Sequence, residues 1–170
     1  MKRICFSIVS VFTITSGLYA QTVSNPLSAD IKQAYEAVKK NLLGAADKMP
    51  EADYNFKPTP EIRGFGEVMQ HVAMAQSHTC GAVAGNSGAQ MPAADGKAAI
   101  IAALKQSFTE CDKAYDSLTD ANAAEMIKSP RGQKTRLGML AGNTTHDTEQ
   151  YAILSVYLRL KGIVPPSSSH

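Results

Sequence analysis

The sequence predicts an all-α protein folded as an antiparallel four-helix bundle. Four segments carry helical periodicity, and no segment shows an alternating strand pattern of useful length. The length of 170 residues suits one domain that buries its own core. Hydrophobic residues make up 44% of the chain and charged residues 19%, which is typical of a globular protein and not of a disordered one.

The first predicted helix runs from about Leu27 to Lys48. Its apolar residues recur at steps of three and four, which places them on one stripe of a helix. The stripe consists of Leu27, Ile31, Ala34, Val38, Leu42, Ala45 and Met49. Pro26 stands in the first turn, where a helix tolerates proline, and Pro50 ends the far side.

The second predicted helix follows a connector, Asp53 to Pro60, whose prolines forbid a regular helix. We expect Gly64 to cap this helix and Glu67 to favour its first turn through the helix dipole. The glycine-rich stretch from Gly85 to Gly88 ends it. Its inward stripe consists of Phe65, Val68, Val72, Ala75, Thr79 and Val83.

The third and fourth predicted helices run from about Lys97 to Leu118 and from about Lys134 to Lys161. The third has the apolar seam of an antiparallel bundle, formed by Ile101, Leu104, Phe108, Cys111, Tyr115 and Leu118. The fourth is apolar on two sides, which is typical of a central helix, and it ends at Gly162. One side consists of Leu137, Leu140, Thr144, Tyr151, Leu154 and Leu158; the other of Met139, Asn143, His146, Gln150, Ile153, Tyr157 and Leu160.

The first twenty residues have the layout of a secretory signal peptide. Lys2 and Arg3 precede an apolar run, and Leu18-Tyr19-Ala20 offers a small residue at the cleavage position. The run is shorter than a transmembrane span of about 20 residues. We therefore expect residues 1–20 to be removed from a periplasmic or secreted protein that keeps no stable membrane span. An uncleaved anchor is the alternative, because Leu18 is unusual at its position before the cleavage site.

Removal of residues 1–20 takes Cys5 away and leaves Cys80 and Cys111 in the mature chain. An even number of cysteines in an oxidising compartment favours a disulfide. Cys111 lies on the stripe of the third helix and Cys80 beside that of the second, so two packed helices can bring them together. The alternative is two buried free cysteines that act as small apolar residues.

The composition argues against a nucleic-acid-binding protein. The net charge is +2, and the sequence has no basic run. Tryptophan is absent and aromatic residues make up 6%, so surfaces for base stacking are poorly supplied. The sequence also lacks a G-x-S-x-G motif, a C-x-x-C motif and a phosphate-binding glycine loop.

Two histidines stand at the centres of predicted helices, His71 in the second and His146 in the fourth. Gln150 follows His146 by four positions, so the two share one helix face. Metal sites inside bundles are built in this way, although distant histidines are more often ordinary core or surface residues. We expect His78, two turns beyond His71, to lie too far along the axis to share an ion with it. We expect Asp147 on the exposed helix surface, the alternative being that it orients a neighbouring imidazole.

Two blocks of the sequence resemble the signature of the DinB-type (DinB/YfiT-like) four-helix bundles. Residues 54–67, a proline-containing connector that leads toward His71, are similar to the first block. Residues 146–151, followed by the R-L-x-G-I-x-P-P-like finish at 157–166, are similar to the last helix. The resemblance implies a DinB-like four-helix-bundle domain over residues 21–166, and we expect residues 167–170 to be a disordered tail.

The resemblance also implies a divalent metal, zinc or nickel, held by one histidine of the second helix and two of the fourth. His71 and His146 match this pattern, and Gln150 stands where the family typically has the third histidine. A neutral amide oxygen is a much poorer ligand than imidazole for such ions, so the implied site is weakened or vestigial.

Two functions of different classes follow from these observations. The first is a binding or non-catalytic module that uses the cavity of the bundle for a small-molecule ligand, or a dimer face for a second copy. The alternative, which the family resemblance implies, is a metal-dependent enzyme, a hydrolase or a thiol-dependent transferase, in which the bundle-core metal activates a thiol or water. The weakened ligand set and the expected export favour the module.

Overall fold

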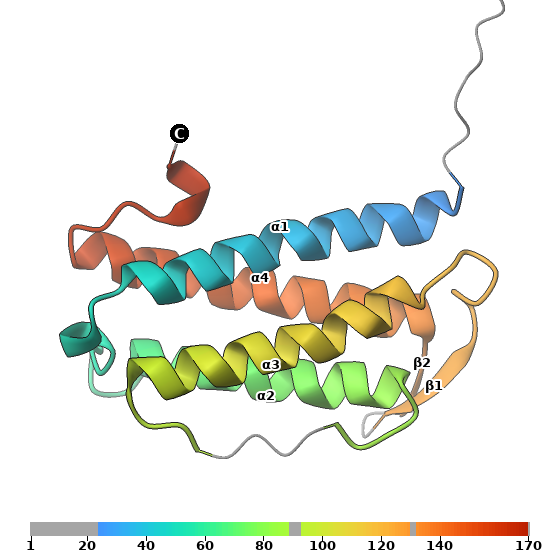
Figure 1. Ribbon diagram of the computed structural model, residues 1–170, viewed down its shortest axis with the longest axis horizontal. Helices are drawn as coiled ribbons and strands as arrows, with labels where there is room; N and C mark the ends of the chain where they lie inside the picture. Colours follow the sequence, from blue (N-terminus) through green and yellow to red (C-terminus); the bar gives the residue numbers. More distant parts are fainter. Residues whose placement is uncertain (1–23, 89–92, 130–131, 170) are drawn as a thin grey trace, which may run out of the picture.

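The computed structural model describes residues 24–88, 93–129 and 132–169 and shows four long helices packed as a bundle (Figure 1). They are α1 (Pro26–Lys48), α2 (Phe65–Val83), α3 (Gly96–Asp116) and α4 (Arg136–Leu160). Short 3-10 turns, Glu51–Asp53 and Pro166–Ser168, follow α1 and α4. The predicted mostly helical bundle is therefore confirmed, with helix boundaries close to those expected.

The direction of the helices is more varied than a simple antiparallel bundle. Helices α1 and α3 are antiparallel, as are α2 and α4 (Figure 1). In the second pair, Val83 at the end of α2 contacts Arg136 at the start of α4, and the earlier His71 contacts the later His146. Helices α2 and α3 run in the same direction. Their contacts advance together along both helices, from the pair Ser77–Glu110 to the pair Cys80–Cys111. The chain thus enters α3 at the end of the bundle where α2 begins.

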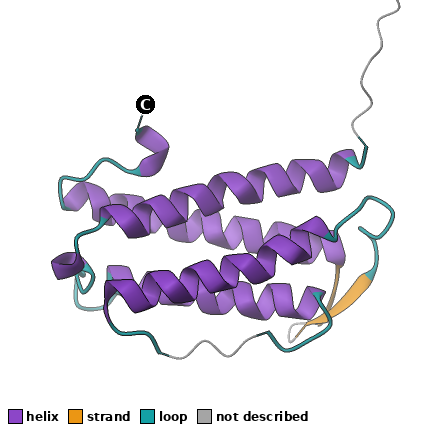
Figure 2. Cartoon of the chain, viewed as in Figure 1, coloured by secondary structure: helices purple, strands orange, loops and turns teal. Residues whose placement is uncertain are grey.

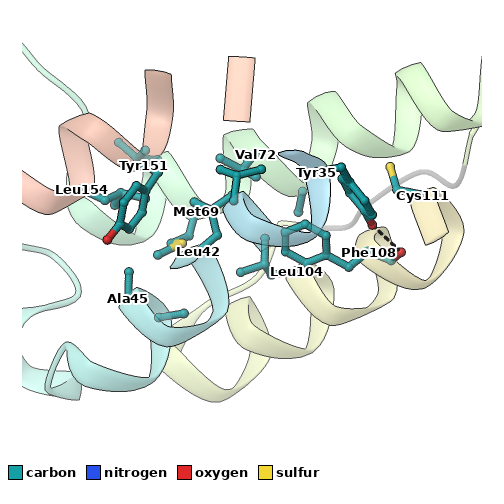
Figure 3. Close-up of a cluster of buried hydrophobic side chains, with 14 of the residues drawn as sticks. Tyr35, Leu42, Ala45, Met69, Val72, Leu104, Phe108, Cys111, Tyr151 and Leu154 are labelled. Atoms are coloured by element: carbon teal, nitrogen blue, oxygen red, sulfur yellow. Dashed lines mark hydrogen bonds between the residues drawn. The ribbon is translucent and has the colours of Figure 1, made fainter. Parts of the chain in front are cut away.

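Most of the predicted stripe residues face a single core, with exceptions in each helix: Leu27, Ile153 and Leu160 are exposed, and Ala75, Thr79 and Ile101 are only partly buried. In α1 the stripe is also shifted by one residue. Tyr35 is fully buried in place of Ala34, which is exposed. The reason is that residues 31, 35, 38 and 42, at steps of four, three and four, lie on one face of the helix. Figure 3 shows the centre of this core, where the Tyr35 hydroxyl donates a hydrogen bond of 3.2 Å to the carbonyl oxygen of Phe108. Large fully buried apolar side chains include Tyr35, Leu42, Phe65, Met69, Leu104, Phe108, Tyr115, Leu140, Leu154 and Leu158.

A short hairpin stands where the sequence predicts no strand (Figure 2). Strands β1 (Met126–Ser129) and β2 (Gly132–Thr135) pair antiparallel between α3 and α4. Each has only four residues with little apolar alternation, so hydrophobic periodicity does not reveal them. Helix α4 consequently begins at Arg136 and not at Lys134, because the Thr135 hydroxyl accepts the Gly138 N–H at 3.0 Å and caps the helix.

The disulfide predicted between Cys80 and Cys111 is present and joins α2 to α3. The two Cα atoms lie 5.1 Å apart, within the usual range for a disulfide. Both cysteines are buried in the core. The cross-link therefore fixes the two parallel helices against each other.

The C-terminal segment differs from the expected disordered tail. Residues 167–169 pack against α1 and α4: Ser167 contacts the Tyr151 hydroxyl through both its N–H and its side chain. Lys48 donates to the Val164 carbonyl oxygen and to the Ser169 hydroxyl. The polar serines are held because side chains of α1 and α4 supply hydrogen-bond partners for them. His170 and the predicted signal peptide, residues 1–20, lie outside the described residues.

No helix in the described part of the chain is both long and apolar enough to cross a bilayer.

Asp120 caps the start of α1, and its replacement gives a pH-dependent test of the fold. Its carboxylate accepts the backbone N–H groups of Leu27 and Ser28 and the Ser28 hydroxyl. Partial burial opposes its ionisation, but these hydrogen bonds outweigh burial and keep the pKa of Asp120 below its ordinary value. The stabilisation is thus present above the ordinary aspartate pKa and is lost as the pH falls through the lower, folded pKa.

We expect Asp120→Asn to lower the melting temperature at neutral pH and to have a smaller effect in acid. Thermal unfolding at both pH values measures this difference. Asp95→Asn is the matched control, because Asp95 precedes α3 without forming a side-chain capping hydrogen bond. An Asp120→Asn effect that does not change with pH would contradict the capping role.

Candidate metal centre

Helices α2 and α4 bring the two predicted histidines into contact at the middle of the bundle. The Nε2 atoms of His71 and His146 lie 3.0 Å apart, and the two rings meet edge to face with centroids 5.0 Å apart. Both side chains are only partly buried. The contact arises because the antiparallel helices place positions 71 and 146 at the same level. The two predicted ligands on different helices are therefore brought together.

A buried carboxylate lies behind His146. Asp147 is fully buried, and its Oδ1 lies 3.4 Å from the His146 Nδ1. Its Oδ2 accepts a hydrogen bond of 3.3 Å from the Asn143 amide, which in turn donates to the Tyr115 hydroxyl. This corrects the expectation that Asp147 is a surface residue. The alternative role, orienting the imidazole of His146, agrees with the observed contact.

The surroundings of the site favour the neutral form of His71, which can bind a metal, and disfavour the ionised form of Asp147. Burial lowers the pKa of His71, and the nearby charges of Arg63 and His146 lower it further. Burial raises the pKa of Asp147, while the contact with His146 opposes this rise. A cation shared by the two imidazoles would offset the cost of burying the Asp147 carboxylate.

The histidine pair opens on a cavity of about 510 Å³ between α2, α4 and the hairpin, which we call the histidine cavity. A volume of this size is typical of small-molecule sites. His78 also faces it, on the same side of α2 as His71. The lining residues are His71, Ala75, His78, Thr79, Ala82, Ser129, Lys134, Met139, Gly142, Asn143 and His146.

Gln150, the third predicted ligand, lines a different cavity. This second cavity, of about 680 Å³, is mostly apolar, and Gln150 shares it with Ile153, Val156 and Tyr157 among others. Across the described ranges, no three histidine, cysteine, aspartate or glutamate side chains are grouped so that they could hold a metal ion. The third ligand at Gln150 stays a prediction.

Comparison with known proteins decides the family. The family model described as the DinB superfamily matches residues 34–154, which is well over half of the chain. The chain belongs to the DinB superfamily. The match includes both histidines, with all of α2 and most of α4.

Two solved structures of DinB-like proteins share the fold. The protein from Bacillus subtilis is 16% identical, with a TM-score of 0.65, and the alignment covers 78% of this chain and 92% of that one. The protein from Bacillus cereus is 13% identical, with a TM-score of 0.69 and coverage of 81% and 95%. At such low identity these similarities concern the fold alone. No curated protein matches the chain.

Proteins of the DinB superfamily often bind a metal, and the histidine pair of this member fits one. Two imidazole nitrogens on one tetrahedral zinc ion, each at about 2.0–2.1 Å, lie about 3.3 Å apart. The observed separation of 3.0 Å, at which the two Nε2 atoms share a hydrogen bond, is close to this value. A carboxylate on the far nitrogen of a metal-bound histidine is also a recurrent feature of such sites. The donor set thus suits a divalent metal but supplies only two imidazoles.

Sequence reasoning gave Asp147 only as an alternative contributor to this DinB-like site and missed Lys134. The spacing of residues in α4 indicates that Asp147 is buried. It lies three residues after Thr144 and four before Tyr151, and both of these belong to the buried stripe of the helix. Lys134 has no such signal, because it was placed in a helix and stands instead on β2, where it lines the histidine cavity. Its place in the site depends on the hairpin.

Proposed function

We propose that this chain is an exported DinB-like binding protein, which holds a divalent metal weakly through His71 and His146 and takes a small-molecule ligand in the histidine cavity. The convergence of the two Nε2 atoms at 3.0 Å carries the proposal. Imidazole nitrogens suit zinc and nickel. Asp147 fixes the orientation of His146 and adds negative charge behind it.

The weakness of the site follows from the number of strong ligands. Structural zinc sites use four protein ligands, and catalytic ones use three with an open position. Here two imidazoles are in place, and the proposed third ligand, Gln150, offers only a neutral amide oxygen. A binding or non-catalytic module therefore accounts for the ligand set better than an enzyme does.

Export is supported by the cysteine chemistry. Disulfides persist in secreted and periplasmic proteins and are rare in the cytosol, where thiols are kept reduced. The cross-link between Cys80 and Cys111 agrees with the signal-peptide layout of residues 1–20.

Isothermal titration of the purified protein with zinc and with nickel tests the metal site. We expect one weakly bound ion per chain and loss of binding in His71→Ala and in His146→Ala. His78→Ala is the matched control, because His78 lines the same cavity but is not part of the pair. Affinity should also fall as the pH drops through the histidine range, since a protonated imidazole cannot bind a metal.

The same titration with Gln150→His tests the third position. If position 150 reaches the ion, an imidazole there should raise the affinity markedly, because imidazole replaces an amide oxygen. Equal affinity of wild type and Gln150→His would remove Gln150 from the ligand set. Retained affinity in both histidine-to-alanine variants would refute the metal site altogether.

A metal-dependent enzyme is the second candidate, and one observation favours it. The buried Asp147 behind His146 resembles the support that catalytic metal ligands receive, and the adjoining cavity has room for a substrate. A bound metal would supply activation of water or of a thiol. Metal-dependent turnover of an ester or of a thiol-acceptor pair, lost in His146→Ala, would favour the enzyme. Metal binding without turnover would favour the module.

A further inference from the structure

One face of the β1–β2 hairpin is turned toward the histidine cavity. The register pairs Ile127 with Lys134 and Ser129 with Gly132, and side chains alternate along a strand, so Ile127, Ser129 and Lys134 share one face. Ser129 and Lys134 line the cavity, and Ile127 packs against the core. Lys128 belongs to the opposite, exposed face.

The hairpin lies at one end of the cavity and the histidine pair at the other. The Arg136 guanidinium, directly after β2, donates to the Val83 carbonyl oxygen at the end of α2. His71 stands in the middle of α2, and His78, between these two points, is about 10 Å from His71 along the helix axis. A ligand that fills the cavity would therefore have two chemically different ends.

The lining of the cavity carries positive charge and no carboxylate. Lys134 supplies the ammonium group of the cavity, and neither aspartate nor glutamate is among the lining residues. Lys134 is exposed and, like Lys128 and several other lysines of the described part of the chain, forms no ion pair, so its ammonium group is available to an anion in the cavity. Ala75, Ala82 and Met139 add apolar wall between the polar ends. Such a surface complements an anion attached to an apolar body.

We propose that the histidine cavity binds a small organic carboxylate, whose anionic group lies at Lys134 and whose apolar body extends along Ala82 and Met139 toward the histidine pair. The inference rests on the proposed function, because it names the ligand class of that same cavity. An ammonium and a carboxylate form a charge-assisted hydrogen bond, which is stronger than a bond between neutral groups. The apolar wall favours an organic acid over inorganic phosphate.

Titration of the isotope-labelled, metal-free protein, followed by amide NMR shifts, tests the proposal. The probes are phenylbutyrate, its neutral amide phenylbutyramide, and inorganic phosphate. We expect saturable shifts at the C-terminal half of α2 and at the hairpin, with the carboxylate binding about tenfold more tightly than either other probe. Lys134→Met should weaken phenylbutyrate binding about tenfold. Lys128→Met, on the opposite face of the same hairpin, should leave the affinity unchanged.

The outcomes separate this proposal from that of the metal site. Equal affinity of wild type and Lys134→Met for phenylbutyrate, equal affinity for acid and amide, or no saturable shift would each overturn the carboxylate site. Thermal unfolding of Lys134→Met confirms that the variant is folded. Phenylbutyrate binding that depends on Lys134, in a protein that binds neither zinc nor nickel, would refute the metal site alone. Metal binding by a protein that does not bind phenylbutyrate through Lys134 would refute the carboxylate site alone.

Discussion

Removal of the disulfide between Cys80 and Cys111 should lower the free energy of unfolding by about 3–4 kcal/mol. The cross-link spans a sequence separation of 31, and closing a loop of that length restricts the unfolded chain by about this amount in the chain-entropy model. Both sulfur atoms are buried between α2 and α3. The loss is a large share of the stability of a single domain, which is typically about 5–15 kcal/mol.

Denaturant unfolding of protein produced in an oxidising compartment measures the loss. The Cys80→Ala, Cys111→Ala double variant lacks both the cross-link and the sulfur atoms, whereas reduction of the wild-type protein breaks the cross-link alone. Addition of a reductant should shift the wild-type transition and leave that of the double variant unchanged. Two free thiols, titrated in denatured but unreduced protein, would show instead that the disulfide does not form.

Replacement of Asp147 by asparagine should weaken metal binding about 10- to 100-fold without weakening the fold. The amide has the shape of the carboxylate but no charge, so it cannot offset the positive charge that a metal places on His146. The free energy of unfolding of the metal-free protein should stay equal or rise, because Asp147 is fully buried and an ionised carboxylate is costly there. The variant therefore separates affinity from stability.

Zinc titration and denaturant unfolding of the same variant measure the two quantities. Glu149→Gln is the matched control, since it makes the same chemical change at an exposed position two residues away on α4. We expect this control to preserve both affinity and stability. A large loss of stability in Asp147→Asn would show that the carboxylate serves the fold, and an unchanged affinity would show that it does not support His146.

Much of the candidate site could be predicted from residue spacing and family resemblance together. His71 and His146 each stand on a helix with a clear apolar stripe, and the resemblance selects them from the four histidines of the chain. Helical period fixes the direction of a side chain relative to its own helix. It does not fix which neighbouring helix the side chain meets, so the contact at 3.0 Å required the packed bundle.

Asp147 illustrates how far residue type can mislead. An isolated helical aspartate is usually exposed, because burial of a charge is costly. In the bundle, Asn143 and His146 supply polar partners, and the stripe of α4 carries the side chain inward. The position on the stripe was readable from the sequence, whereas the partners that make burial tolerable lie in the tertiary structure.

The amino-acid sequence by itself determined the four helices, and it favoured the pairing of Cys80 with Cys111 and membership of the DinB superfamily, because helical period, cysteine count and family motifs can be read without the tertiary structure. Only the tertiary structure decided that α2 and α3 run in the same direction and that a hairpin precedes α4. It also decided that Gln150 and the histidine pair line different cavities. The physical reason is that helix direction, a four-residue strand and the shape of a cavity all depend on contacts between segments distant in the chain, which local spacing does not encode.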